Sequence, residues 1–415
     1  MTQSHILSNY KVLDMSQFLA GPTTSRLMAE LGAEVIKVEI APYGDRARAF
    51  PFRKGGRSGY FVQHNRGKKS VCVNIKEPRA KEILVGLIEK CDVLLQNFAP
   101  GVMERMGFGW EEVQKINPKI VMCSISAFGQ TGPLSNRPGF DYIAQAYAGV
   151  TDVMGEADGP PSLAQVAMGD IGTGVHATGA IAFALLDRTR TGKGQHLDIS
   201  LLDSYFHYHD MNVETYSADQ RNGGELGFVP TRGGSHHHTG CPTGIFQSKE
   251  NFVLICTAVH QWKYLCKVIG REDLIKKPGW RTMAERRANL DEVVKLIEDW
   301  MQEQDSDDEV IRKMEEGRVP IAPVMSVPEA MAHPHLIERG TVRTISDPVL
   351  GEFQIPGMPL RFSAYPDLLD LVSPGLGEQN AQVLSETLSY SADQIKTLEE
   401  DGVLVSRMRK KQAGE

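Results

Sequence analysis

Several features that mark whole classes of protein are missing from this sequence. Its six cysteines are scattered with no Cys-x-x-Cys pair, so neither a zinc site nor a disulfide framework is predicted, and reduced thiols are expected. No apolar run reaches the length of a membrane span, and no signal peptide is evident. The net charge of −7 argues against a nucleic-acid partner. We therefore expect a cytoplasmic protein that binds neither membrane nor nucleic acid.

The composition that is present suits a large globular protein. The 415 residues are 41% hydrophobic and 23% charged, and this length predicts more than one domain. Short apolar runs alternate with helical stretches, which predicts a parallel α/β sheet with helices on both faces. Strands are expected at residues 10–14, 35–39, 70–75, 92–96 and 120–126, and helices at residues 20–31 and 78–90. No Gly-x-Gly-x-x-Gly sequence follows the first strand, so no dinucleotide cofactor is predicted.

Ligands of parallel sheets bind beyond the carboxyl ends of the strands. Three loops leave predicted strands at that edge, at residues 17–21, 97–101 and 128–133. The sequence therefore predicts a ligand cleft formed by these loops.

Residues 167–174 place one carboxylate, Asp170, among glycines before a small-residue helix expected at residues 175–186. Gly169 allows another molecule close to the backbone, and an exposed carboxylate at such a junction can act as a nucleophile. The alternative is that Asp170 is an N-cap, because aspartate accepts hydrogen bonds from the free amides of a first helical turn. The residues alone leave both interpretations open.

The second half of the chain changes character. Residues 222–244 are rich in Gly, Pro and His and predict a long loop. A smaller unit should follow, with a hairpin and amphipathic helices, before a strand pair from residue 342 and two final helices. Residues 236–238 are three consecutive histidines, but a metal site usually needs separated ligands on a rigid frame. No metal is predicted.

Short motifs then occur in order along nearly the whole chain, and together they resemble the class III CoA-transferases, the family of formyl-CoA transferase and carnitine CoA-transferase. The motifs lie at residues 14–22, 31–39, 96–101, 117–133, 168–170, 191–195 and 377–378. The resemblance implies a doubly wound, mostly parallel large domain with an inserted, smaller α+β domain, and two copies interlocked as a homodimer. The implied boundaries are residues 1–225 and 328–415 for the large domain and residues 226–327 for the small one.

The resemblance also implies a mechanism. Asp170 falls on the position of the nucleophilic aspartate, which forms a mixed anhydride with the acyl group of an acyl-CoA and then an aspartyl-CoA thioester. An acceptor carboxylic acid completes the transfer. Coenzyme A is then part of the substrate, no cofactor is tightly bound, and the partners are an acyl-CoA, a small carboxylic acid and a second copy of the chain. Backbone amides of residues 169–172 are candidate oxyanion donors.

By position in the family, two groups of residues should line the substrate site. Gly233 and Gly234 correspond to a glycine-rich lid. Lys76 and Arg105 resemble contacts to CoA phosphates, although a lone basic side chain is usually a solvated surface charge. Ile40 stands where many members carry Arg or Pro, so one phosphate contact is expected to be lost. The residues expected to line the CoA cleft are Leu19, Ala20, Val73, Asn97, Phe98, Arg137 and Gly139, beside Lys76 and Arg105.

Two alternatives to a transferase remain: an α-methylacyl-CoA racemase-like enzyme and a non-catalytic CoA-binding homologue. A racemase needs two acid–base groups flanking the α-carbon. Family racemases carry a histidine where this chain has Phe140, and phenylalanine cannot carry a proton. Asp141 is one residue further on, and His176 is expected to be packed or solvated. The transferase interpretation is therefore preferred.

Overall fold

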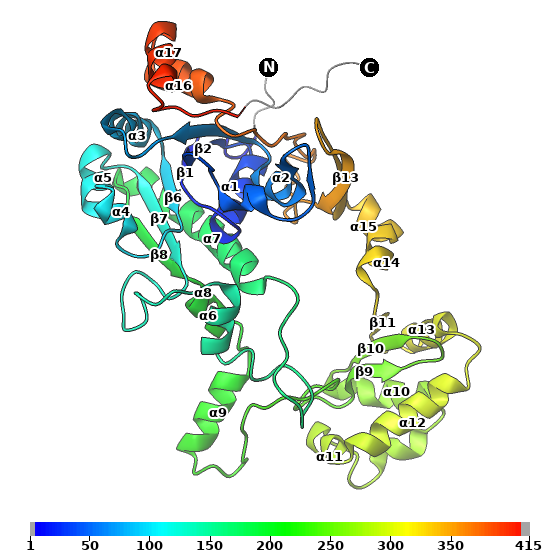
Figure 1. Cartoon of the computed structure of the whole chain (residues 1–415). Coiled ribbons are helices and arrows are strands. Elements are labelled where there is room, and N and C mark those ends of the chain that lie inside the picture. Colours follow the sequence, from blue (N-terminus) through cyan, green and yellow to red (C-terminus); the bar gives the residue numbers. More distant parts are fainter. Residues whose placement is uncertain (1–4, 408–415) are drawn as a thin grey trace. The chain divides into compact units, whose positions relative to one another are not determined.

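A computed structural model describes residues 5–407 of the chain (Figure 1). Its contacts divide the chain into two compact units. The large unit comprises Met1–Ala148, Val166–Tyr208 and Pro334–Glu415, and the small unit comprises Gly149–Gln165 and His209–His333. The domain boundaries expected near residues 225 and 327 stay a prediction.

The large unit is built on a parallel sheet of six strands, which confirms the predicted α/β class. The strands lie in the order β5 (Lys68–Val73), β2 (Glu34–Ile40), β1 (Lys11–Asp14), β6 (Val93–Gln96), β7 (Val121–Ser126) and β8 (His196–Ser200). Five of them were predicted from apolar runs. The edge strand β8 was missed because its sequence, HLDIS, is half polar and mostly half-exposed.

Helices cover both faces of this sheet. On one face, α1 (Ala20–Glu30) packs along α7 (Met168–Thr191). On the other, α3 (Pro78–Lys90) shares a core with α16 (Asn380–Leu388) and α17 (Ala392–Glu400), so the C-terminal part of the chain packs against strands from the beginning. The remaining helices of the unit are η1 (Arg46–Ala49), α2 (Gly59–Asn65), α4 (Val102–Arg105), α5 (Trp110–Ile116), α6 (Asp141–Tyr147), α8 (Leu201–His207) and α15 (Pro334–Glu338). Two hairpins complete it, β3 (Arg53–Lys54) with β4 (Arg57–Ser58) and β12 (Val342–Asp347) with β13 (Gly351–Pro356).

The small unit has its own core between an antiparallel sheet and helices. The expected hairpin is β9 (Thr243–Gln247) and β10 (Phe252–Cys256). Although prolines flank and end it, β11 (Ile321–Pro323) pairs with β10 as an edge strand, the position at which a sheet tolerates proline. The helices are α9 (Asn212–Arg221), η2 (Val259–Gln261), α10 (Trp262–Val268), η3 (Glu272–Lys276), α11 (Met283–Ala288), α12 (Leu290–Gln302), α13 (Asp307–Glu316) and α14 (Val327–Ala332).

Candidate active site

A buried charge network fixes the loop that follows β1. Lys68 Nζ lies 3.0 Å from Asp14 Oδ2, and Lys37 Nζ lies 3.0 Å from Asp45 Oδ2, with all four side chains almost fully buried. Burial alone raises the pKa of Asp14, but the charges of Lys37 and Lys68 hold it far below its usual range. Burial lowers the pKa of Lys68 to about 7. These two ion pairs therefore form a fixed, buried support for the loop that follows β1.

The same network sets the loop's conformation. Lys37 Nζ donates to the Ser16 carbonyl at 2.7 Å, and Asp45 Oδ1 accepts the Phe18 N–H at 3.0 Å. Phe18 has a φ of 66°, a strained backbone for a non-glycine residue that this bonding maintains. The start of α1 is therefore held rigidly at the carboxyl edge of the sheet.

The loop after β6 is tied to the loop after β1. The Asn97 side chain accepts the Gln17 N–H at 2.8 Å and donates to the Gln17 carbonyl at 2.7 Å. This reciprocal pair joins two of the three loops that were predicted to meet at this edge.

A cavity of 390 Å³ lies at the carboxyl ends of β1, β2 and β6. Of the residues predicted for the CoA cleft, Phe98 lines it. Arg46 and Tyr43 also line it and were not predicted. Arg46 is exposed on η1, six residues after Ile40, so a cation does stand near the place where one was expected to be lost.

The other predicted CoA residues are distributed around the same edge. Leu19 is the N-cap residue of α1, Ala20 begins that helix, and Val73 ends β5. Gly139 follows β7, where a Cβ atom would stand 2.6 Å from Ala127 Cβ. The three basic residues, Lys76, Arg105 and Arg137, are exposed, and Arg137 donates to the Tyr147 hydroxyl at 2.7 Å. Contact of these residues with CoA stays a prediction.

Asp170 lies at the start of α7, but not as its cap. The helix begins at Met168 rather than near residue 175, and its N-cap residue is Ala167, so the N-cap interpretation of Asp170 is wrong. The early start follows from close packing of α7 on α1. A Cβ atom on Gly174 would lie 2.7 Å from the Ala20 carbonyl oxygen, a contact that only glycine permits.

A second carboxylate, Asp141, holds the backbone of Asp170. Asp141 is buried at the start of α6, and its Oδ2 accepts the Asp170 N–H at 2.7 Å. Its Oδ1 accepts a hydrogen bond from the hydroxyl of Tyr205 on α8. The Ile171 N–H bonds to the Ala167 carbonyl at 3.1 Å. These two amides are thus already used, which corrects the expectation that they are open to an oxyanion.

The surroundings of Asp170 favour its protonated form. Burial, and then the nearby negative charge of Asp141, raise the pKa of Asp170 to about 7. Burial and the charges of Asp170 and Asp45 also raise the pKa of Tyr60 on α2, so this phenol stays neutral close to Asp170. A carboxylate with so high a pKa is a stronger base and nucleophile once it is ionised.

Aromatic rings from four segments gather around this end of the large unit. The centroid of the Phe18 ring lies 5.9 Å from that of Phe50 and 6.1 Å from that of Phe140. The centroids of Phe50 and Tyr60 are 4.8 Å apart. These rings give the region beside Asp170 an apolar wall. Phe140 immediately precedes Asp141, so the wall is attached to the segment that holds Asp170.

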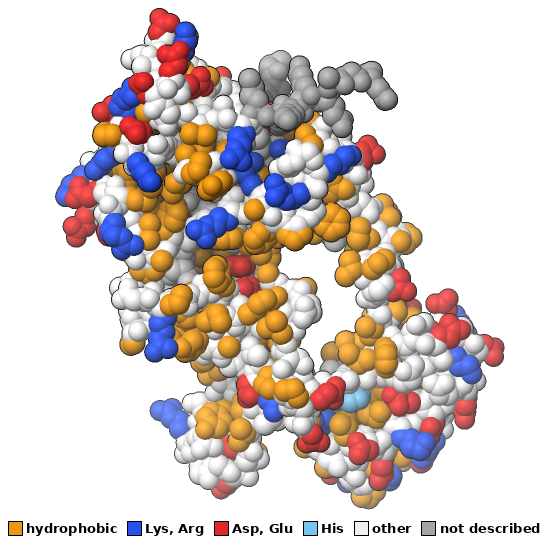
Figure 2. All heavy atoms as spheres, viewed as in Figure 1, with side chains coloured by type: hydrophobic (Ala, Val, Ile, Leu, Met, Phe, Trp, Pro, Cys, Tyr) orange, Lys and Arg blue, Asp and Glu red, His pale blue; other side chains and the backbone are white. Residues whose placement is uncertain are grey.

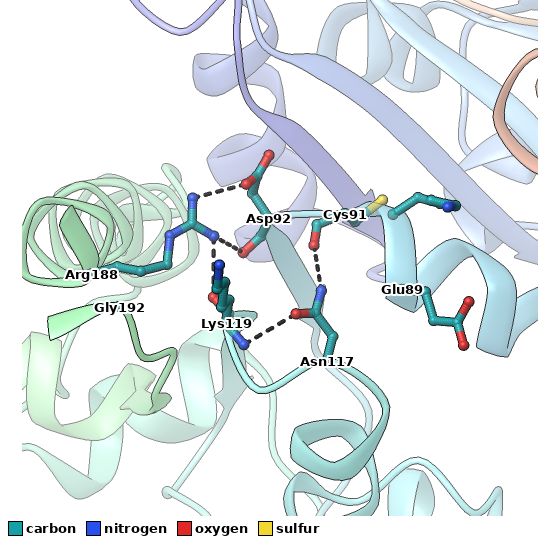
Figure 3. Close-up of a pocket in the computed structure, with 8 residues that line it drawn as sticks. Glu89, Cys91, Asp92, Asn117, Lys119, Arg188 and Gly192 are labelled. Atoms are coloured by element: carbon teal, nitrogen blue, oxygen red, sulfur yellow. Dashed lines mark hydrogen bonds and ion pairs between the residues drawn. The ribbon is translucent and has the colours of Figure 1, made fainter.

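A second cavity, of 400 Å³, lies at the far end of α7 (Figure 3). There Arg188 pairs with Asp92 at 2.8 Å and donates to the Lys119 carbonyl at 3.1 Å, while Asn117 donates to the Cys91 carbonyl at 2.9 Å. Arg188 and Asn117 thus bond to groups that line the same cavity. The bonds of Arg188 anchor the C-terminal end of α7 to the segments that precede β6 and β7.

The predicted lid belongs to the small unit. The Gly234 N–H donates to the Gly155 carbonyl at 3.1 Å, and Arg232 pairs with Asp152 at 2.9 Å, so this loop is bonded within its own unit. Its action as a lid stays a prediction. Within residues 5–407, no three His, Cys, Asp or Glu side chains group in a way that could hold a metal ion. Across the same residues, no helix has the length and apolar character to cross a membrane.

A model of the CoA-transferase family III matches residues 7–380. Succinyl-CoA:glutarate CoA-transferase of Mus musculus is 35% identical over 405 residues, covering 96% of this chain and 90% of that protein. Formyl-CoA:oxalate CoA-transferase of Streptomyces avermitilis is 34% identical over 412 residues, covering 96% and 99%. The crystal structure of a CAIB/BAIF family protein from Brucella suis superimposes with a TM-score of 0.79 at 33% identity, covering 93% of this chain and all of the other.

Proposed function

The chain belongs to CoA-transferase family III, and we propose that it moves CoA from an acyl-CoA to a carboxylic acid with Asp170 as the covalent carrier. The observation that carries this proposal is the Asp170 carboxyl itself. It stands in the first turn of α7 beside an apolar wall, with a raised pKa and its backbone fixed by Asp141. The relatives named above are acyl-CoA:carboxylate CoA-transferases, which supports the reaction class.

The proposed reaction runs through four substitutions at carbonyl carbons. The ionised Asp170 attacks the thioester carbonyl, the carbon–sulfur bond breaks, and CoA thiolate leaves a mixed anhydride. The thiolate attacks the aspartyl carbonyl, releasing the donor acid and leaving an aspartyl-CoA thioester. The acceptor carboxylate attacks this thioester, forming a second anhydride and thiolate. The thiolate then attacks the acyl carbonyl of the acceptor, giving the new acyl-CoA and regenerating Asp170.

The raised pKa of Asp170 has a direct consequence for this cycle. The attacking form is the carboxylate, and with a pKa of about 7 roughly half of the protein carries it at neutral pH. A high pKa also brings the aspartate closer in basicity to a thiolate than an ordinary aspartate is, which favours exchange between anhydride and thioester. The transfer rate should therefore rise with pH through about 7.

CoA is proposed to lie along the carboxyl edge of the sheet. The cavity at β1, β2 and β6 would take part of it, with Arg46 as a phosphate partner. Lys76 and Arg105 remain candidates for other phosphate groups. The loops after β1 and β6, joined through Gln17 and Asn97, would present a preformed wall.

We further propose that a second copy of the chain covers α7. Ile171, Val175, Phe183 and Leu186 are 37–73% exposed and follow a helical spacing along one side of this helix. In Figure 2, hydrophobic side chains gather over the part of the large unit where Figure 1 places α6, α7 and α8. A soluble monomer rarely leaves so extended an apolar stripe open to water. The homodimer implied by the family resemblance would bury it.

The experiment that tests the reaction is a matrix of acyl-CoA donors against carboxylic acids, read by mass spectrometry. Succinyl-, acetyl- and formyl-CoA are suitable first donors, with glutarate and oxalate as acceptors. The proposal expects a new acyl-CoA to appear as the donor is consumed. Incubation with 2-methylacyl-CoA esters in deuterated water tests the racemase alternative. Deuterium at the α-carbon with no CoA passed to any acid would overturn the transferase.

A further inference from the structure

Tyr205 is a buried polar side chain that the proposed reaction does not use. It lies on α8, is 0% exposed, and donates its hydroxyl to Oδ1 of Asp141. The other oxygen of Asp141 accepts the Asp170 N–H at 2.7 Å. Three helices, α8, α6 and α7, are thus joined through one carboxylate whose two oxygens each have a partner.

The Tyr205 ring also fixes the shape of the first turn of α7. A Cβ atom on Gly169 would lie 2.1 Å from Tyr205 Cε2 and 2.7 Å from its Cζ, so the ring presses on the backbone where a side chain cannot fit. Gly169 immediately precedes Asp170. Tyr205 therefore touches Gly169 directly and reaches the Asp170 N–H through Asp141.

The start of α7 depends on this outside support. The first amides of a helix have no partner within it, and the N-cap residue Ala167 has no side chain that could accept from them. Asp141 supplies that acceptor from α6. Burial and the hydrogen bond to Asp141 raise the pKa of Tyr205, so the phenol remains a donor at neutral pH and keeps the Asp141 carboxylate in one orientation.

We propose that Tyr205 is a positioning residue for the transfer reaction: through Asp141 it fixes the backbone of Asp170 and so aims the Asp170 carboxylate at the thioester. The inference rests on the proposed function, in which Asp170 is the nucleophile. Small displacements of a reacting group strongly reduce rates, because attack needs a narrow range of approach. In this scheme Tyr205 touches neither the substrate nor a reacting atom. Its loss is therefore expected to lower kcat and to leave KM nearly unchanged.

The test is Tyr205→Phe, which keeps the ring against Gly169 and removes the hydroxyl. Loss of a hydrogen bond to a charged group should lower kcat about tenfold and leave KM for acyl-CoA within about twofold. Tyr208→Phe is the matched control. Tyr208 presses on the same helix at Gly172, but the two oxygens of Asp141 take their hydrogen bonds from Tyr205 and Asp170, so this variant should keep a kcat close to that of the wild type.

A double-mutant cycle with Asp141→Asn separates positioning from general packing. If Tyr205 acts through Asp141, Tyr205→Phe should have almost no further effect on kcat in the Asp141→Asn background. Additive losses, a Tyr205→Phe kcat within twofold of wild type, an equal loss in Tyr208→Phe, or unfolding of Tyr205→Phe would each overturn the inference. Asp170→Ala is assayed in parallel: if it still transfers CoA, the proposed nucleophile is wrong, whereas an inactive Asp170→Ala beside a fully active Tyr205→Phe refutes only the role of Tyr205.

Discussion

Asp141→Asn should shift the pH dependence of the transfer reaction to lower pH. The substitution keeps an oxygen that can accept the Asp170 N–H and removes the negative charge beside the Asp170 carboxyl. That charge is the second cause, after burial, of the rise of the Asp170 pKa from 3.8 to about 7. Because the larger cause stays in place, the charge accounts for less than half of the rise, and the midpoint should fall by about one pH unit.

This change has a measurable size at acidic pH. With a pKa of about 7, roughly one tenth of Asp170 is ionised at pH 6, and with a pKa near 6 about one half is. Activity at pH 6, as a fraction of the plateau at high pH, should therefore rise about fivefold in the variant. The plateau itself should fall, because a less basic carboxylate is a weaker nucleophile.

The assay is kcat/KM for acyl-CoA from pH 5 to 9, with products separated by chromatography. Asp187→Asn is the control, since Asp187 is partly exposed near the other end of α7 and pairs with Arg190. It should leave the profile unchanged. An unaltered or higher midpoint in Asp141→Asn would refute the reasoning, because it would mean that Asp170 does not respond to the charge of Asp141.

Gly169→Ala forces a Cβ atom against the buried Tyr205 ring, so the free energy of unfolding should fall by about 1–3 kcal/mol and transfer should be nearly lost. A variant with the melting temperature and turnover of the wild type would show that the ring does not press on Gly169. Asp170→Asn should melt about 2–4 °C higher than wild type at pH 8. The sign follows from the raised pKa of Asp170 in the folded state. Between pH 3.8 and about 7 the folded state holds the proton more tightly than the unfolded state, so the stability of the wild type falls as pH rises, and the neutral amide avoids this loss. A difference in melting temperature between variant and wild type that is the same at pH 8 and at pH 4 would refute this reasoning. Phe183→Glu places a charge on the exposed stripe of α7 and should shift the particle mass by light scattering from dimer toward monomer, while a dimer unaffected by the substitution would place the interface elsewhere.

The strands of the sheet were predictable because their signal is local. Each of the five predicted strands is a short apolar run buried in the sheet, and α3 was predicted with its observed bounds, Pro78–Lys90, because proline marks its first turn and apolar residues recur at helical spacing. The polar edge strand β8 carries no such signal. The start of α7 was placed too late because its glycines are poor helix formers, and close packing on α1 outweighs that preference.

The site was only partly accessible from sequence. Asp170 was found because its motif lies in family order, but Asp141 and Tyr205 were not assigned a role in holding it. They are 29 and 35 residues away from Asp170 in the chain, and only the packing of α6 and α8 on α7 brings them to it. A buried aspartate that begins a helix gives no local sign of bonding to a distant amide. The pKa of Asp170 depends on the same packing and could not be predicted either.

If Asp170 is acylated during turnover, the acylated intermediate can be trapped. The wild-type protein is incubated with a donor acyl-CoA that the transfer screen has shown to be a substrate, treated with hydroxylamine, and digested for peptide mass spectrometry, with Asp170→Asn treated in the same way. Attack of hydroxylamine on an aspartyl anhydride or thioester should leave a hydroxamate on Asp170 in the wild type and none at that position in the variant. Sustained CoA transfer with no modification of Asp170, or with the hydroxamate on a different carboxylate, would show that Asp170 is not the covalent carrier.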